Sequence, residues 1–296
     1  MLYVRPPVAA GTFYDLDKSR LKMQIEAALG HKPGPSGEKK AGKGKNEFVA
    51  AIVPHAGYVY SGAVAALAYS KVGNGNTNFI ILGPNHTGSG SDFAIMPKGL
   101  WKTPLGGVAV DEKMAGRLLE DCKLLSVDYM PHAYEHSIEV QLPFLQHMLG
   151  SNFKFVPICV RNEAADETLL EACRVIGKSL AKVVESSERI NKTNKSPKEK
   201  WIIIASSDFS HYVPRELAER NDMHAIKAIL KLDEGDFFSR INARNISICG
   251  FGPIAATIVA AKSLGAKKGK LLKYATSGDI TGELESVVGY ASISFS

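Results

Sequence analysis

Three histidines in this 296-residue chain follow apolar runs that have the length and composition of buried strands. The three pairs of run and histidine are residues 48–53 with His55, residues 79–82 with His86, and residues 201–205 with His211. In an open α/β sheet, ligands bind in the crevice outside the carboxyl ends of the strands. We therefore expect the three histidines to share one site.

Transition-metal binding is the chemistry that this pattern favours. Neutral imidazoles are common ligands for first-row metals, and two histidines with one anionic ligand leave coordination positions open for a substrate or oxygen. Asp208, Glu139 and Cys249 are candidates for the third ligand, and spacing alone does not choose among them. A metal-free site is the alternative, in which Asp208 orients a histidine base. Asp208 and His211 could equally position a ligand or move a proton.

The elements that must position these residues are strands alternating with helices. The strands are apolar on both faces, which predicts a largely parallel sheet covered by helices on each side. Strands are expected at 48–53, 78–82, 93–96, 108–110, 153–160, 201–207, 271–275 and 287–295, and helices from Asp15 or Asp17 to about Gly30 and at 61–71, 112–122, 134–149, 166–185, 215–231, 234–241 and 253–264. The predicted fold is a single α/β domain over residues 1–296, with a mostly parallel central sheet flanked by helices.

The predicted helix at 134–149 carries two further polar candidates. His136 and Glu139 are three residues apart, so a helix would place them on one face. Pro143 predicts a kink or a restart within this segment.

The net charge of +6 is concentrated in two polar tracts. Residues 32–46 carry +4 and residues 188–200 carry +3, so the remainder of the chain is close to neutral at −1. Both tracts have the composition of solvated loops, and we interpret residues 31–46 and 188–200 as basic flexible insertions. The charge therefore does not indicate a nucleic-acid partner.

Several classes of protein are excluded by missing signals. There is no P-loop and no Gly-x-Ser-x-Gly nucleophile elbow. Residues 250–255 match the dinucleotide pattern Gly-x-Gly-x-x-Ala only loosely, because no clear strand precedes them, so no nucleotide cofactor is expected. The sequence shows no signal peptide and no apolar run of 18 residues, which predicts a cytoplasmic protein without a membrane span.

The four cysteines form no Cys-x-x-Cys pair, and three of them lie mostly within apolar segments. Those three, Cys122, Cys159 and Cys173, are expected to be small buried residues. Cys249 differs because it lies in a glycine-rich turn ahead of a helix, where a thiol can be presented to a cleft.

Six motifs, in order along nearly the whole chain, resemble those of the Memo family. They are residues 5–14 (RPPVAAGTFY), 54–62 (PHAGYVYSG), 83–86 (GPNH), 135–139 (EHSIE), 206–212 (SSDFSHY) and 249–250 (CG). This family includes the animal mediator of cell motility protein and the prokaryotic AmmeMemoRadiSam system protein B. The two basic insertions lie outside the resemblance.

The resemblance implies a fold similar to that of class III extradiol dioxygenases, which are non-haem iron enzymes. It also implies a metal site with His55, His86 and Cys249 as ligands, lined by Asp208 and His211. The dioxygenases use a carboxylate where this family places a cysteine, and a thiolate favours softer ions such as copper. The animal relatives resemble copper-linked redox proteins and are also described as phosphotyrosine-peptide binders. In prokaryotes the family name implies a radical-SAM protein and an AMMECR-type protein as partners.

These observations together predict a metal-dependent redox enzyme or oxygenase that uses Fe(II) or Cu and acts on a small substrate. His55, His86 and Cys249 are the expected metal ligands. His211, oriented by Asp208, and His136 are the expected proton-transfer or substrate-contact residues. One alternative is a non-catalytic binding module for a peptide or partner protein, and the other is a metal-independent hydrolase that uses Asp208 and His211.

Overall fold

The computed structural model describes residues 3–30, 48–73, 76–150, 152–161, 163–193 and 199–296. Residues 31–46, the first predicted insertion, lie outside these ranges. The second predicted insertion is partly described. Helix α6 (Glu167–Thr193) runs well past the predicted end at residue 185, so residues 188–193 are helical.

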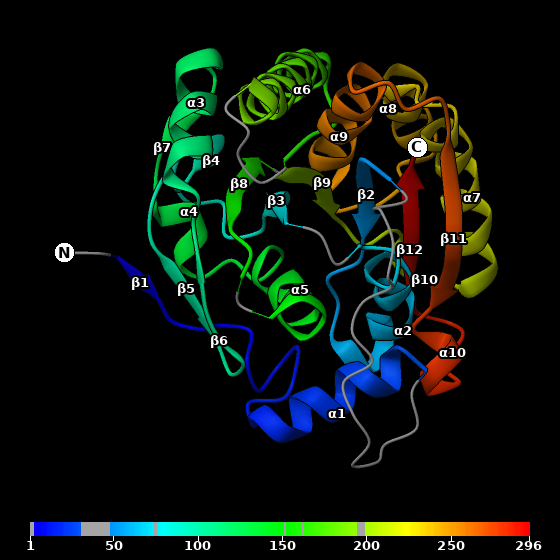
Figure 1. The fold of residues 1–296 in the computed structure, drawn as a ribbon. Coiled ribbons are helices and arrows are strands. Elements are labelled where there is room, and N and C mark those ends of the chain that lie inside the picture. Colours follow the sequence, from blue (N-terminus) through cyan, green and yellow to red (C-terminus); the bar gives the residue numbers. More distant parts are fainter. Residues whose placement is uncertain (1–2, 31–47, 74–75, 151, 162, 194–198) are drawn as a thin grey trace.

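Four parallel strands form the centre of the main sheet, in the order β2, β9, β3, β8 (Figure 1). Their bounds are β2 (Ala50–Val53), β9 (Lys200–Ser206), β3 (Thr77–Asn85) and β8 (Phe155–Arg161). Because these neighbouring strands run in the same direction, all their carboxyl ends lie at one edge of the sheet and all their amino ends lie at the other.

Antiparallel strands extend the sheet on both sides, so the sheet is mixed. Strand β12 (Val287–Phe295) pairs antiparallel with β2. It also pairs antiparallel with β10 (His211–Val213) and β11 (Gly269–Thr276). On the other side β4 (Phe93–Ile95) runs antiparallel to β8 and pairs with β7 (Ser126–Val127). The predicted α/β fold with a mostly parallel central sheet is confirmed, with the parallel pairing concentrated at its centre.

Helices cover both faces because successive residues of the central strands are apolar and point to opposite sides. In β9, Ile203 and Ala205 pack into one core, while Ile202 and Ile204 pack into the other. The helices of the first face are α3 (Glu112–Asp121), α6, α7 (Arg215–Leu230), α8 (Glu234–Arg244) and α9 (Phe251–Ser263). The helices of the second face are α1 (Lys18–Ala28), α2 (Tyr58–Tyr69) and α5 (Leu142–Leu149) (Figure 1).

Smaller elements complete the described chain. A three-stranded sheet is formed by β1 (Val4–Arg5), β5 (Leu100–Thr103) and β6 (Gly106–Ala109), and the remaining short helices are α4 (Met130–Ala133), η1 (Glu139–Gln141) and α10 (Gly278–Thr281). None of the helices in the described ranges has both the length and the apolar content needed to cross a bilayer.

The helix predicted at 134–149 begins only at Leu142, so the prediction for residues 134–138 is wrong. Pro143 occupies the first turn of α5, where its missing N–H removes no hydrogen bond. The preceding residues form a loop and the single turn η1. His136 and Glu139 therefore do not share a helix face: the His136 ring lies beside His86, and Glu139 lies against the N-terminal segment.

The N-terminal segment 5–14 is anchored by the buried carboxylate of Glu139. This carboxylate accepts hydrogen bonds from the backbone N–H groups of Val8 and Ala9, both at 2.9 Å, and from the Tyr14 hydroxyl. It also forms an ion pair with Arg5, and both side chains are fully buried. Arg5 donates in addition to the carbonyl oxygens of His132 at 2.6 Å and Glu135 at 2.7 Å. The pair thus joins the start of the chain to residues 132–139.

We expect Arg5→Met to lower the free energy of unfolding by about 3–5 kcal/mol, because removal of one partner leaves the Glu139 carboxylate buried without its counter-charge. Urea denaturation measures this change. Arg20→Met is the matched control, since Arg20 pairs with Asp15 at the surface and its loss should change stability little. Equal stability of the two variants would contradict a structural role for the buried pair.

Candidate metal centre

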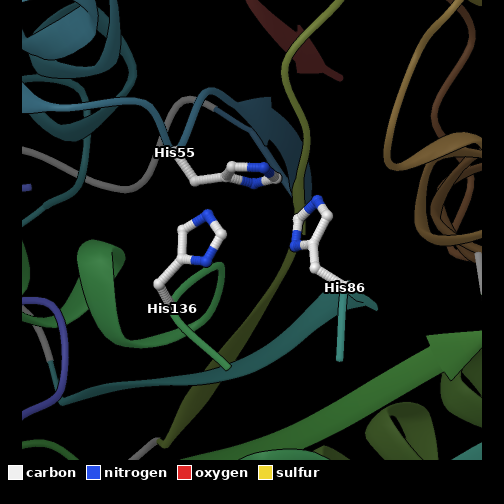
Figure 2. A group of neighbouring side chains, drawn as sticks. All are labelled: His55, His86 and His136. Carbon is white, nitrogen blue, oxygen red and sulfur yellow. The ribbon is translucent and has the colours of Figure 1, made fainter. Parts of the chain in front are cut away.

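Three histidine side chains meet at the carboxyl edge of the parallel strands. His55 follows β2 and His86 follows β3, while His136 comes from the loop between α4 and η1. The ring of His55 lies 5.3 Å from those of His86 and His136, centroid to centroid, and the rings of His86 and His136 stack at 4.8 Å. Figure 2 shows the three imidazoles arranged around a common space. One ring nitrogen from each lies within 4.8 Å of the others.

The tautomer of His55 is fixed by a buried serine. Its Nδ1 lies 2.9 Å from the Ser206 hydroxyl oxygen. That hydroxyl donates its one hydrogen to the Ser137 carbonyl at 2.6 Å and accepts from Gln141 Nε2 at 2.7 Å. His55 Nδ1 must therefore carry a hydrogen and donate it to Ser206. The lone pair of His55 is left on Nε2.

Glu135 fixes His86 in the same manner. Its carboxylate accepts from the His86 backbone N–H at 2.6 Å and lies 2.9 Å from His86 Nδ1. It also accepts from the Ser137 backbone N–H at 2.9 Å. Burial alone would raise the pKa of Glu135, but these hydrogen bonds and the neighbouring histidines lower it to about 2. The ionised carboxylate holds a hydrogen on Nδ1 of His86 and leaves its Nε2 with a lone pair.

His136 stacks between two other rings. Its partners are His86 on one side and Phe13, at a centroid distance of 4.2 Å, on the other. Its Nδ1 lies 3.4 Å from the Glu135 carboxylate. Phe13 belongs to the N-terminal segment, so this segment forms one wall of the site.

The environment of the cluster keeps two of its imidazoles neutral. Burial, followed by the charge of His86, lowers the pKa of His55 to about 3. Burial and the charge of His55 lower the pKa of His136 to about 4. Neutral imidazole is the form that binds a metal, so the donor set fits a divalent transition ion.

Cys249 adds a sulfur atom beside His55. Its Sγ lies 3.2 Å from His55 Nε2 and accepts a hydrogen bond from the Asp208 backbone N–H at 3.3 Å. Burial, together with the charge of Asp208, raises the pKa of the thiol. A Cβ atom at Gly250 would collide with the side chain of Ser207, so glycine at this position allows the cysteine turn to approach the end of β9. The structure thus brings Cys249 to His55.

Asp208 and His211 line the same edge but are not hydrogen-bonded partners in the described structure. The Asp208 carboxylate accepts from the backbone N–H groups of His55 at 2.9 Å and Ala56 at 3.3 Å. Burial raises its pKa. The His211 Nδ1 donates instead to the Ser247 carbonyl at 2.8 Å, so Ser247, and not Asp208, orients this ring. The positive charge that His211 gains on protonation still acts on both Asp208 and His55.

The sequence-based selection of site residues needs two changes. Glu139 was one of the three candidates for the third ligand, but Arg5, Tyr14 and the N-terminal backbone occupy its carboxylate. Glu135 and Ser206, which hold the histidine rings, and Gln141, which holds Ser206, were not among the site residues predicted from the sequence. A signal for Glu135 was present, since a carboxylate directly precedes His136 in the sequence.

Comparison with known proteins identifies the relatives of this chain. The family model described as Memo-like protein matches residues 5–294. A MEMO1 family protein of Methanopyrus kandleri is 42% identical over 293 residues, and one of Methanococcus maripaludis is 46% identical over 296 residues. Each alignment covers 98% of this chain and 98% of the relative.

A solved structure shares the fold at much lower sequence identity. It is an uncharacterized protein of Escherichia coli K12, which is 13% identical and superposes with a TM-score of 0.52. The match covers 83% of this chain and 99% of the other.

Glu135→Gln should weaken metal binding by about 10–100-fold. Three N–H donors face the two carboxylate oxygens, and the amide NH₂ that replaces one of these oxygens cannot accept a hydrogen bond. Competition with a chromophoric chelator measures the affinity. Glu216→Gln, on the exposed surface of α7, is the matched control. An affinity equal to that of the control variant would show that Glu135 does not position His86.

Proposed function

The chain belongs to the Memo family, and we propose that it is a metal-dependent redox protein that binds Fe(II) or Cu at the histidine cluster. The observation that carries the proposal is the pair of buried supports behind the rings. Ser206 and Glu135 each accept a hydrogen bond from Nδ1, of His55 and His86 respectively. The Nε2 atom of each ring therefore keeps its lone pair, which an ion can bind.

The proposed ligands combine nitrogen and sulfur donors. His55 and His86 are kept from the ligands predicted from the sequence, and His136 is added as a third nitrogen donor because its ring nitrogen lies near theirs. Cys249 is proposed as the sulfur donor because its Sγ lies beside the Nε2 of His55. A mixed imidazole and thiolate set suits copper or iron better than hard ions such as Mg²⁺. When bound, such a metal supplies one-electron chemistry and activates oxygen or a small substrate.

Two residues around the cluster are proposed to serve the reaction without holding the metal. His211 donates through Nδ1 to Ser247, so its Nε2 carries the lone pair that can take a proton from a substrate. Asp208 holds the backbone of His55 and Ala56 in place. A metal-free site with Asp208 orienting a His211 base receives no support, because Ser247 takes that position.

Metal content tests the site directly. We expect protein purified without added metal or chelator to contain Fe or Cu, and His55→Ala to lose it, because this variant removes the most buried nitrogen donor. Inductively coupled plasma mass spectrometry gives the metal content. His224→Ala is the control, since His224 lies on α7 and contacts Arg240. Full metal content in His55→Ala would contradict the ligand assignment.

The redox part of the proposal has its own readout. Copper-loaded protein should cycle between an oxidised form with an electron paramagnetic resonance signal and a reduced form without one, when ascorbate and then oxygen are added. A bound copper that keeps one oxidation state under both treatments would contradict a redox role while leaving the metal site intact.

Proton release distinguishes the role of Cys249. Because burial raises the pKa of its thiol, Cys249 is protonated in the free protein and must lose a proton to bind a metal as thiolate. Metal binding should therefore release about one more proton in the wild type than in Cys249→Ser, and the affinity should rise more steeply with pH. Titration calorimetry in buffers of different ionisation enthalpy counts these protons. Equal release would leave the metal with histidine ligands alone.

A further inference from the structure

A buried carboxylate of α7 lies behind the residues that lead from β9 to His211, and the proposed reaction does not yet use it. It belongs to Asp222, which has no exposed surface. Helix α7 packs against β10, β11 and β12 (Figure 1). The Asp222 side chain lies where these elements meet, at the same end of the sheet as the metal centre.

Three donors hold the two oxygens of this carboxylate. Its Oδ1 accepts from the Ser210 backbone N–H at 3.0 Å and from the Ser210 hydroxyl at 2.6 Å. Its Oδ2 accepts from the Tyr274 hydroxyl of β11 at 2.7 Å. Because Ser210 directly precedes His211, these hydrogen bonds fix the backbone from which the His211 side chain extends.

Strand β12 supports the same residues from the other side. The Phe209 N–H donates to the Gly289 carbonyl at 2.8 Å, and the Gly289 N–H donates to the Ser210 carbonyl at 2.8 Å. A Cβ atom at Gly289 would lie 2.1 Å from Asp222 Oδ2, so glycine at this position lets the carboxylate lie against β12. The backbone of residues 209–210 is thereby held between α7 and β12.

Asp222 carries its charge without an ion-pair partner. Within the described residues, Arg215 makes the ion pairs of α7, and Asp222 takes part in none of them. Burial raises the pKa of Asp222 to about 6, although hydrogen bonds from Ser210 and Tyr274 and the charge of His211 lower it. An ionised carboxylate in such a place is costly unless a positive charge approaches it. His211 supplies that charge when it takes up a proton.

We propose that Asp222 is a positioning residue for His211: it fixes the His211 backbone through Ser210 and stabilises the proton that the imidazole takes from a substrate. The proton moves to His211 Nε2, and Asp222 remains ionised. The inference rests on the proton-transfer role proposed for His211 and gives this histidine a buried counter-charge. Asp208 is also near His211, but its carboxylate already holds the backbone of the metal ligand His55.

Other titratable groups face the pair from three strands. Tyr274 faces Asp222 from β11, and Asp208 and His55 face His211 from the ends of β9 and β2. Tyr274 is neutral because burial raises its pKa. His55 is neutral because burial lowers its pKa to about 3. Removal of the Asp222 charge therefore leaves Asp208 as the carboxylate among these groups that acts on His211.

Proton uptake by the His211 ring tests the proposal. Nuclear magnetic resonance of full-length protein with ¹³C-labelled histidine follows the eight histidine rings as the pH changes, and His211→Gln identifies the His211 signal. The protein is loaded with Zn²⁺, a diamagnetic ion that keeps the signals sharp. The same titration without metal remains valid if the metal centre binds no ion, so the two proposals fail separately.

Asp222→Asn removes the negative charge and keeps the shape of the side chain. Its amide oxygen can still accept from Ser210, and its NH₂ group can donate to the Tyr274 oxygen. We expect the titration midpoint of His211 to fall by about half a pH unit or more, because a nearby negative charge favours the protonated ring. Glu216→Gln, which removes an exposed carboxylate of the same helix, is the matched control and should leave the midpoint unchanged.

The wild-type protein provides a second measurement that does not depend on the folding of a variant. Asp222 is ionised above its pKa of about 6 and protonated below it. Protonation weakens the hydrogen bond that the carboxylate accepts from the Ser210 N–H. The Ser210 backbone amide resonance should therefore move as the pH falls through about 6, and it should not move in this range in Asp222→Asn.

Two results would overturn the proposal. The first is a His211 midpoint that is equal in Asp222→Asn and Glu216→Gln, with both variants folded as judged by circular dichroism, since a purely structural Asp222 gives this outcome. The second is a wild-type Ser210 amide resonance that stays in place across the pH range in which Asp222 titrates.

Discussion

The buried ion pair between Arg5 and Glu139 is the interaction on which the arrangement of the metal centre depends. Neither side chain has any exposed surface, so each is stable there only because the other is present. Arg5 also holds the carbonyl oxygens of His132 and Glu135, and Glu139 holds the N-terminal backbone. This pair fixes residues 132–139 against the start of the chain. The loop that carries His136 is thereby placed beside the strand ends that carry the other two histidines.

Hydrogen bonds behind the rings of His55 and His86 orient these two members of the donor set. Ser206 and Glu135 accept from the Nδ1 atoms of His55 and His86, so both rings present the same nitrogen to the shared space. Gln141 and Ser137 in turn fix Ser206, which extends the support to η1 and its loop. Burial keeps His55 and His136 neutral. A bound ion would therefore meet two imidazoles, those of His55 and His86, that already present Nε2, whereas the Cys249 thiol must lose a proton to bind.

The polarity of the parallel strands separates the molecule into two edges with different chemistry. The carboxyl edge collects imidazoles, a thiol and a buried carboxylate, whereas the amino edge has a pocket lined by both basic and acidic side chains, among them Arg117 and Glu199. The same helices, α6 and α9, pack along the sheet between these edges. Each edge is thus built on a framework that the other edge also needs, and a ligand at one edge would stabilise the whole domain by binding only its folded form.

The central strands, most helices and the grouping of His55 and His86 could be predicted from the amino-acid sequence, because continuous apolar runs and the residues that end them are local features. The motifs also identified the family, which the comparisons confirm. The position of residues 134–141 follows from tertiary contacts, because Pro143 starts a helix there and the preceding residues are held by the distant Arg5. Contacts of the same kind occupy Glu139, orient His211 through Ser247 and fix the rings through Glu135 and Ser206. These outcomes depend on contacts between residues 36 to 151 positions apart, which no local pattern encodes.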